Sequence, residues 1–189
     1  MLESESLQRA IHEPVRILPY DPSWPKLFEQ EEARLHGICP TAFLGIEHIG
    51  STAVPMLSAK PVIDLMAGVP SLARADAIMP ILCANGYTTS AEFNATLADR
   101  RWLMRYSEGH RTHHLHLVIF QGDEWRNRLV FRDVLKANAE IRSRYEDLKV
   151  KLMKEAGSDR EAYTAMKTDF VKETLQRAVS RDQILPPTN

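Results

Sequence analysis

The sequence has few cysteines, no long hydrophobic runs and little net charge. Its two cysteines, Cys39 and Cys83, lie in apolar surroundings without metal-type spacing. They predict buried free thiols and a reducing, cytoplasmic setting. Its apolar runs are much shorter than the roughly 20 residues that a transmembrane helix needs, so we expect no membrane span. The first residues contain neither a basic nor an apolar segment, so we do not expect a signal peptide.

Positive and negative side chains are almost equal in number. Lys and Arg total 24 and Asp and Glu total 25, for a formal net charge of -1 in 189 residues. This balance argues against broad nucleic-acid binding and against a polybasic membrane anchor. The charge is unevenly distributed, with a net -6 over residues 1–99 and +6 over residues 100–154. The basic middle indicates either a local anion site or solvated helix surface.

Hydrophobic periodicity predicts alternating strands and helices. Helices are expected over residues 24–37, between Ser71 and Asn85-Gly86, and from residue 123 onward, with Ser23, Ser71 and Ser158 as N-caps. Strands are expected over 15–18, 43–49, 62–69, 87–90, 101–106 and 113–120, with a short helix across 52–58. The order predicts an α/β (α+β) fold with one mixed sheet and a helical C-terminal third. We expect a single domain over residues 14–180, monomeric or homodimeric, with flexible tails at 1–13 and 181–189.

The sharpest local motif is Gly50-Ser51-Thr52, where a predicted strand ends and a helix begins. Glycine allows close approach of a ligand, and hydroxyls and amides at a helix start suit phosphate oxygens. Twelve residues after Thr52, Asp64 interrupts the apolar strand Val62–Val69. A lone carboxylate there is costly unless it is paired or binds a metal ion. The alternative interpretation is a capped turn to which Asp64 is hydrogen-bonded.

A histidine-rich strand follows later in the chain. In Thr112-His-His-Leu-His-Leu117, period-2 alternation places His114 and His116 on one face and His113 on the other. Two histidines two residues apart on a strand can bind one metal ion, and imidazole favours zinc, manganese, iron or nickel over magnesium. The alternatives are a polar sheet face without metal and, for His113, a core histidine.

Four further charged residues are candidates for the same site. Glu47 is a candidate third ligand or general base, and an edge carboxylate is an equally plausible interpretation. Arg101 and Arg105 share a strand face, and each is suited to bind a phosphate through two parallel hydrogen bonds. Lys60, beside the Gly-Ser turn, is a candidate for the same role. For all three cations the default interpretation is solvated charge.

Several longer strings of the sequence are distinctive when taken together: Val15–Pro25, Ile46–Pro55, Ala59–Leu65, Arg111–Leu117, Leu129–Asp133, Tyr145–Lys149 and Tyr163–Phe170. With these strings the chain resembles the GrpB family of small bacterial proteins over about residues 14–178. The resemblance implies a nucleotidyltransferase fold, in which a Gly-Ser turn holds the phosphates of a nucleotide and carboxylates on two strands bind magnesium ions. Gly50, Ser51 and Asp64 match the first parts of that pattern.

The sequence departs from this pattern at three positions. Met66 stands where the second carboxylate is expected, and His114 or His116 stands in place of the third. Met56 stands where the GrpB pattern usually has glycine. The missing second carboxylate weakens the case for the usual two-magnesium chemistry.

Three hypotheses follow for the function. The first is an enzyme that transfers a nucleotidyl or phosphoryl group. Its phosphate-binding residues would be Gly50, Ser51, Thr52, Lys60, Arg101 and Arg105. One metal ion (Mg, Mn or Zn) would bind at Asp64, His114 and His116, and Glu47 would be the base. The second is a metal-dependent hydrolase using the same three ligands. The third is a non-catalytic ligand-binding or accessory module on the same fold, which would bind a nucleotide or another small phosphorylated molecule without turnover.

Overall fold

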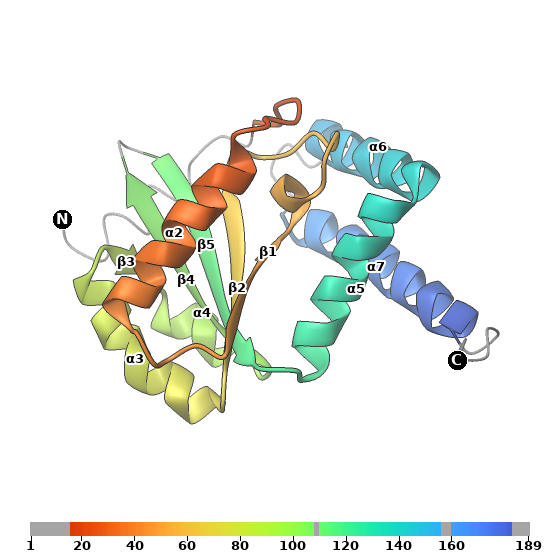
Figure 1. Cartoon of the computed structure of the whole chain (residues 1–189). Helices are drawn as coiled ribbons and strands as arrows, with labels where there is room; N and C mark the ends of the chain where they lie inside the picture. The colour runs from red at the N-terminus through yellow and green to blue at the C-terminus, as the bar shows by residue number, and fades with distance from the viewer. Residues whose placement is uncertain (1–15, 108–109, 156–159, 183–189) are drawn as a thin grey trace. The chain divides into compact units, whose positions relative to one another are not determined.

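The computed structural model describes residues 16–107, 110–155 and 160–182 (Figure 1). The chain forms two compact units, one up to Arg126 and one from Asn127 onward, and each is described by itself. The described residues contain a five-stranded mixed sheet and six α-helices, which confirms the predicted fold class. The expected single domain over residues 14–180 stays a prediction.

The sheet contains both parallel and antiparallel neighbours. Its strands are β1 (Gly45–Ile49), β2 (Ile63–Val69), β3 (Tyr87–Thr88), β4 (Arg100–Ser107) and β5 (His110–Ile119). Their order is β1-β2-β5-β4-β3, and only β2 and β5 run parallel. Of the strand expected over 15–18, residue 15 lies outside the described residues, and the described part forms a single bridge between Leu18 and Ala59.

Of the N-caps predicted at Ser71 and Ser23, only Ser71 makes a capping hydrogen bond. Helix α3 (Leu72–Ala84) begins as predicted, with the Ser71 hydroxyl accepting a hydrogen bond from the Arg74 amide. Helix α2 (Trp24–Ile38) has Ser23 at its N-cap position, but the Ser23 side chain makes no capping bond. Its backbone is already helical (φ -79°, ψ -18°), whereas a capping serine needs an extended backbone. The Ser23 amide instead donates to Asp21 Oδ1 at 2.8 Å.

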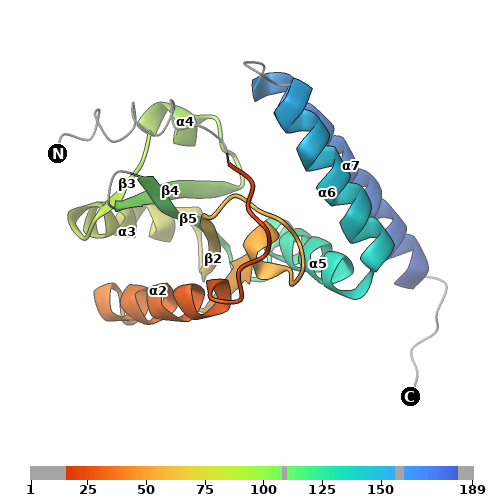
Figure 2. The same cartoon turned by 90° about the horizontal axis from the view of Figure 1, so that it is seen from above.

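Two short helical segments differ from the expectation. The helix predicted across 52–58 is only a 3₁₀ turn, η1 (Ser51–Ala53), and the chain is already extended at Val54. A short helix that the periodicity did not predict, α4 (Ala91–Ala95), follows β3 and has the Ser90 hydroxyl as its cap. Figure 2 shows α2 and α4 on opposite sides of the sheet.

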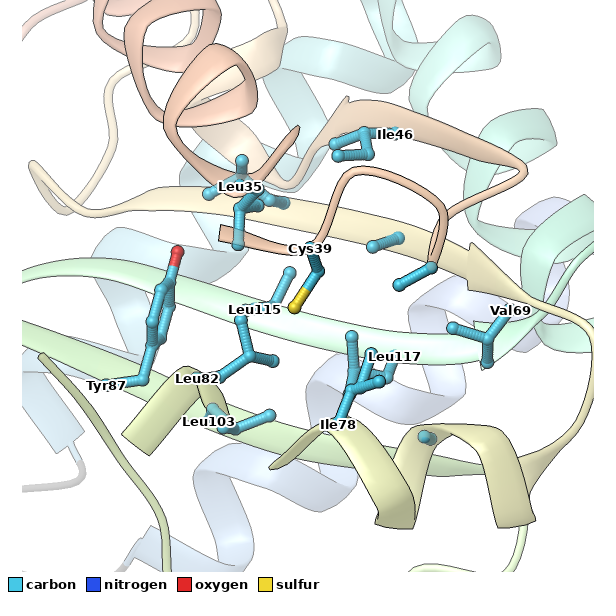
Figure 3. Packing of buried hydrophobic residues seen from close by; sticks show 14 of the residues in the cluster. Leu35, Cys39, Ile46, Val69, Ile78, Leu82, Tyr87, Leu103, Leu115 and Leu117 are labelled. Carbon is cyan, nitrogen blue, oxygen red and sulfur yellow. The ribbon is translucent and has the colours of Figure 1, made fainter. Parts of the chain in front are cut away.

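The main core lies between the sheet and helices α2 and α3. Figure 3 shows side chains of Leu35, Ile78 and Leu82 from these helices meeting Leu115 and Leu117 of β5. All five are 2% exposed or less, so the centre of this face is closed to solvent. Neither cysteine forms a disulfide, as predicted; Cys39 is buried as expected, whereas Cys83 is only half-buried.

The second unit is helical, as predicted for the C-terminal third. It contains most of α5 (Asp123–Ala137), then α6 (Ala139–Glu155) and α7 (Arg160–Asp182). The rings of Phe131, Tyr145 and Phe170 pack together with centroids 5.3 to 6.5 Å apart. The predicted cap Ser158 lies outside the described residues. None of the described helices has the length and apolar character needed to cross a membrane.

Candidate functional site

The two faces of the sheet differ in chemistry. We call the face under α2 and α3 the helix face. The opposite face, which we call the site face, carries Asp64 and Met66 of β2, His114 and His116 of β5, and Glu47 of β1. Direct pairing places these residues together, since Asp64 is opposite His114 and Met66 is opposite both His116 and Glu47. The predicted separation of His114 and His116 from His113 is confirmed.

Asp64 is the centre of the polar group on the site face. Its Oδ1 atom lies 3.0 Å from Nδ1 of His114 and 3.9 Å from Nε2 of His116. The side chains of Asp64, His114 and His116 are 27%, 18% and 12% exposed. Each side chain is therefore largely desolvated and keeps a small part of its surface in contact with solvent. The structure thus brings together the three residues that the sequence proposed as metal ligands.

Gly50 makes room for the Asp64 carboxylate. Its φ of +72° is a backbone conformation that favours glycine. A Cβ atom at this position would lie 2.3 Å from Oδ2 of Asp64, which is well inside van der Waals contact. Ile49 pairs with Asp64, so the turn that follows β1 runs directly beside the carboxylate. The Gly-Ser motif and Asp64, 14 positions apart in sequence, thus form one structure.

The charge of Asp64 is stabilised by its histidine neighbours. Burial by itself raises the pKa of the Asp64 carboxyl, but hydrogen bonds and electrostatic interactions with His114 and His116 outweigh it. The pKa of Asp64 therefore lies well below its usual range. At neutral pH this side chain is an anion, as a cation ligand must be.

The position of the missing second carboxylate is also defined. Met66 lies two residues beyond Asp64 on the site face, and its side chain is fully buried. Glu47 is half-buried on the neighbouring strand, opposite Met66 rather than opposite Asp64. The described part of β2 therefore presents one carboxylate, and the second acidic side chain on this face comes from β1.

The residues around the turn have unequal access to this group. Thr52 is 1% exposed, and its hydroxyl lies 3.0 Å from Nε2 of His48 and 3.5 Å from the Val62 carbonyl. It therefore anchors the turn internally and is not presented to a ligand. Ser51 and Lys60 are half-buried at the two ends of the segment that links β1 to β2.

The structure does not bring Arg101 and Arg105 to the site face. Their partners in β5 are Leu117 and His113, which belong to the helix face. Arg101 forms two hydrogen bonds with Asp76 of α3, and Arg105 pairs with the buried Glu31 of α2. Strand alternation placed the two arginines on one face, as the sequence indicated. The helices packed against that face then took both guanidinium groups as ion-pair partners.

The buried Glu31 organises a polar cluster beneath α2. It accepts hydrogen bonds from the Tyr87 hydroxyl at 2.6 Å and from Arg34 at 3.0 Å, in addition to its Arg105 partner. His113 lies next to this cluster and is 9% exposed. Burial is the main reason why the pKa of His113 falls to about 4, with Glu31 opposing and Arg105 adding to the shift. His113 is therefore a neutral core histidine at pH 7.

Sequence reasoning missed the aromatic border of the site face. Trp102 of β4 is opposite His116, and its ring centroid lies 5.4 Å from that of His114. Phe93 of α4 contacts Trp102 edge-on at 5.4 Å. Alternation in β4 places Trp102 on the face opposite to Arg101, but the neighbour on that face depends on pairing with β5. The sequence therefore predicts which face of β4 carries Trp102, but not that His114 lies beside it.

The donor atoms around Asp64 define where a metal ion would have to bind. Nδ1 of His114 and Nε2 of His116 lie 3.0 and 3.9 Å from Oδ1 of Asp64. The Nε2 atom of His114 is buried without a hydrogen-bond partner among the described residues, but it is on the side of the ring away from the carboxylate. No three His, Cys, Asp or Glu side chains of residues 16–107, 110–155 and 160–182 are already arranged to hold a metal ion. A metal ion at Asp64, His114 and His116 therefore stays a prediction.

Comparison with known proteins gives a consistent family. The sequence profile of the GrpB protein family matches residues 14–177. The glutamate-rich protein GrpB of Alkalihalophilus pseudofirmus is 33% identical over 169 residues, covering 85% of this chain and 94% of that protein. The crystal structure of the conserved protein GrpB from Enterococcus faecalis is similar with a TM-score of 0.77 and 33% identity, over 89% of this chain and 99% of that one.

Some relatives are longer than this chain. A protein named dephospho-CoA kinase from Mycolicibacterium paratuberculosis is 31% identical over 199 residues, covering 94% of this chain but only 48% of that protein. The YqkA protein of Bacillus subtilis is 31% identical, over 87% of this chain and 47% of that protein. The chain thus spans about half the length of these two relatives.

Proposed function

The chain belongs to the GrpB family, and we propose that it binds a nucleotide or another phosphorylated small molecule together with one divalent metal ion. The ligand would lie on the site face of the sheet, where β1 ends and β2 begins. The reaction that such a site would support is transfer of a nucleotidyl or phosphoryl group to an acceptor.

One observation supports this proposal more than the others. Ring nitrogens of His114 and His116 lie 3.0 and 3.9 Å from Oδ1 of Asp64. The other carboxylate oxygen of Asp64 faces Gly50. Polar side chains on the inner strands of a sheet are costly to bury unless they pair with one another or bind a charged ligand. The experiment below distinguishes a binding site from an Asp64–His114 pair that only stabilises the fold.

The roles of the residues follow from their chemistry. Asp64 Oδ1, with Nδ1 of His114 and Nε2 of His116 beside it, would contribute to holding the cation. Gly50 and Ser51 border the carboxylate and would contact phosphate oxygens. A bound cation would polarise a phosphoryl oxygen and neutralise charge that develops there. Glu47 remains the proposed base, because it is the second acidic side chain on this face.

Met66 limits the chemistry and favours a second candidate function. A buried thioether cannot replace the second carboxylate of a two-metal centre, so the proposal is restricted to one cation. The same observation favours a module that binds its ligand without turnover. The three-ligand hydrolase is less well supported, since no ready three-ligand group exists within the described residues.

The longer relatives are compatible with phosphate chemistry. Proteins named dephospho-CoA kinase contain a region similar to this chain within about half of their length. A kinase name describes phosphoryl transfer by those proteins. It makes a phosphorylated ligand the first class to test for this chain.

Calorimetric titration of the whole protein with ATP and GTP, each with and without Mn²⁺, tests the proposal. We expect metal-dependent binding that Asp64→Asn abolishes. The matched control is Asp76→Asn, because that exposed aspartate pairs with Arg101 on the helix face. Binding that survives in Asp64→Asn, or that never occurs with the wild type, would overturn the proposed site.

Product analysis then separates the two candidate functions. The nucleotide is incubated with the wild-type protein and Mn²⁺ and followed by ³¹P NMR. Loss of a phosphoryl group or formation of a new phosphoester indicates transfer. Binding without any change in the nucleotide indicates a non-catalytic module.

A further inference from the structure

A row of three rings connects the solvent to the Asp64 carboxylate. Phe93 of α4 is 45% exposed and packs edge-on against Trp102 with an interplanar angle of 86°. Trp102 contacts the ring of His114, and His114 binds Asp64. Each step of this row is a direct contact, so the exposed aromatic ring belongs to the same surface as the proposed phosphate site.

Hydrogen bonds hold the outer part of the row in place. Asn94 is 8% exposed, although it is a polar residue of a short surface helix. The side-chain oxygen of Asn94 accepts a hydrogen bond from the main-chain amide of Trp102 at 2.7 Å. Its side-chain nitrogen donates to the main-chain carbonyl of Trp102 at 2.9 Å. The Thr89 hydroxyl donates to the same carbonyl and accepts from Asn94. Helix α4 is thereby locked onto β4, and Phe93 is held beside Trp102.

An exposed phenylalanine in such a well-ordered setting suits a planar ligand. Aromatic side chains next to a charged site are the usual platform for nucleobases, because every base has a π-face. Trp102 and Asp64 are on strands separated by β5, two strand spacings of about 4.8 Å apart, and the pairing offsets them by two residues along the strands, so about 12 Å separates the two positions. The ribose and the first phosphates of a nucleotide can bridge that span between a stacked base and a phosphate beside Asp64.

We infer that Phe93 and Trp102 form a nucleobase-stacking platform, which makes the ligand of the site face a nucleoside phosphate rather than a phosphorylated sugar or acid. This inference rests on the proposed function and specifies its ligand class. It assigns the base to α4 and β4 and the phosphates to the turn after β1.

Tryptophan fluorescence provides a direct readout. The protein has three tryptophans, and Trp24 and Trp125 are buried at 3% and 6% exposure. Trp102 is therefore the tryptophan that a bound base contacts. We expect ATP with Mn²⁺ and, at higher concentration, adenosine alone to change the emission. Inorganic tripolyphosphate with Mn²⁺ should bind without a stacking signal.

Substitution of Phe93 provides the decisive comparison. Phe93→Ala should weaken ATP binding by about fivefold or more and leave tripolyphosphate binding unchanged, since stacking contributes only to the base. Phe93→Tyr retains the ring and should restore ATP affinity. Ile81→Ala is the matched control, because Ile81 is similarly exposed (47%) but lies on α3 at the helix face.

The outcomes distinguish this inference from the proposed function. If ATP and tripolyphosphate both bind and Phe93→Ala weakens neither, the platform is overturned and the phosphate site stands. If neither phosphate compound binds, the proposed function fails, and the adenosine titration decides the platform alone. Adenosine quenching that Phe93→Ala removes would support the platform, and its absence would overturn it.

Discussion

Asp64 Oδ1 lies 3.0 Å from Nδ1 of His114, across the parallel pairing of β2 and β5. The two residues are 50 positions apart in sequence, and they meet because the paired strands are in register at this point. The second carboxylate oxygen faces Gly50, which ends the neighbouring strand β1. The surroundings of the Asp64 carboxylate therefore depend on three neighbouring strands: β2 contributes Asp64, β5 contributes His114, and the turn after β1 contributes Gly50.

The fit between Gly50 and Asp64 predicts a strong effect of adding one methyl group. Gly50→Ala should lower the free energy of unfolding by at least about 1–2 kcal/mol, because alanine disfavours a positive φ and its Cβ would collide with the carboxylate. Denaturant unfolding measures this change. Gly37→Ala is the matched control, since nothing lies within 4 Å of that Cβ and alanine favours a helix. Equal effects of the two substitutions would contradict the expected packing.

Met56 predicts a substitution that stabilises the protein. Its φ is +66° and its side chain is 75% exposed, so it has a strained backbone and little packing to lose. Met56→Gly should raise the free energy of unfolding by roughly 0.5–1 kcal/mol, after the greater freedom of glycine in the unfolded chain is subtracted. Met56→Ala keeps the Cβ and should give no such gain. A melting temperature lowered by glycine would refute the strain at this turn.

The buried Glu31 predicts the largest loss of stability. Glu31→Gln leaves Arg105 and Arg34 without their carboxylate partner in a site that is 2% exposed, and we expect a loss of about 3 kcal/mol. Equilibrium unfolding in urea measures it. Glu173→Gln breaks the exposed pair with Arg177 on α7 and should change stability by less than about 0.5 kcal/mol. If the two substitutions had similar effects, the cluster beneath α2 would not be a stabilising element.

Lys149 predicts a pH dependence of stability. It is 4% exposed beside the Tyr145 ring, and burial lowers its pKa from 10.5 to about 8, helped by Lys167 and opposed by Glu146. Between pH 8 and 10.5 the unfolded chain retains a proton that the folded protein has released. The contribution of Lys149 to the free energy of unfolding therefore rises with pH across this window, and below pH 8 its full penalty persists.

The test is the difference between two lysine substitutions. Lys149→Met should stabilise the protein by about 2–3 kcal/mol at pH 7, and most of this gain should vanish by pH 10. Lys151→Met changes an exposed lysine on the same helix and should show no such trend. A gain for Lys149→Met that is constant with pH would show that packing, and not ionisation, is its cause.

Local signals in the sequence predicted much of this architecture. The helical spacing of Trp24, Phe28 and Leu35 matches α2, and Ser71 caps α3 as its position indicated. Alternation correctly separated His114 and His116 from His113. These features succeed because helical and strand periodicity and capping depend on residues only a few positions apart.

Tertiary structure decided which of the candidate residues meet. The pairing of β2 with β5 brought Asp64 to the histidines, and the packing of α2 and α3 took Arg101 and Arg105 as ion-pair partners on the other face. The Thr52 hydroxyl was directed inward to His48, and Trp102 was placed against His114. Alternation determines the faces within one strand, but strand order and register depend on long-range packing. By itself the sequence therefore determined the residues available for a site, and only the fold selected those on one surface.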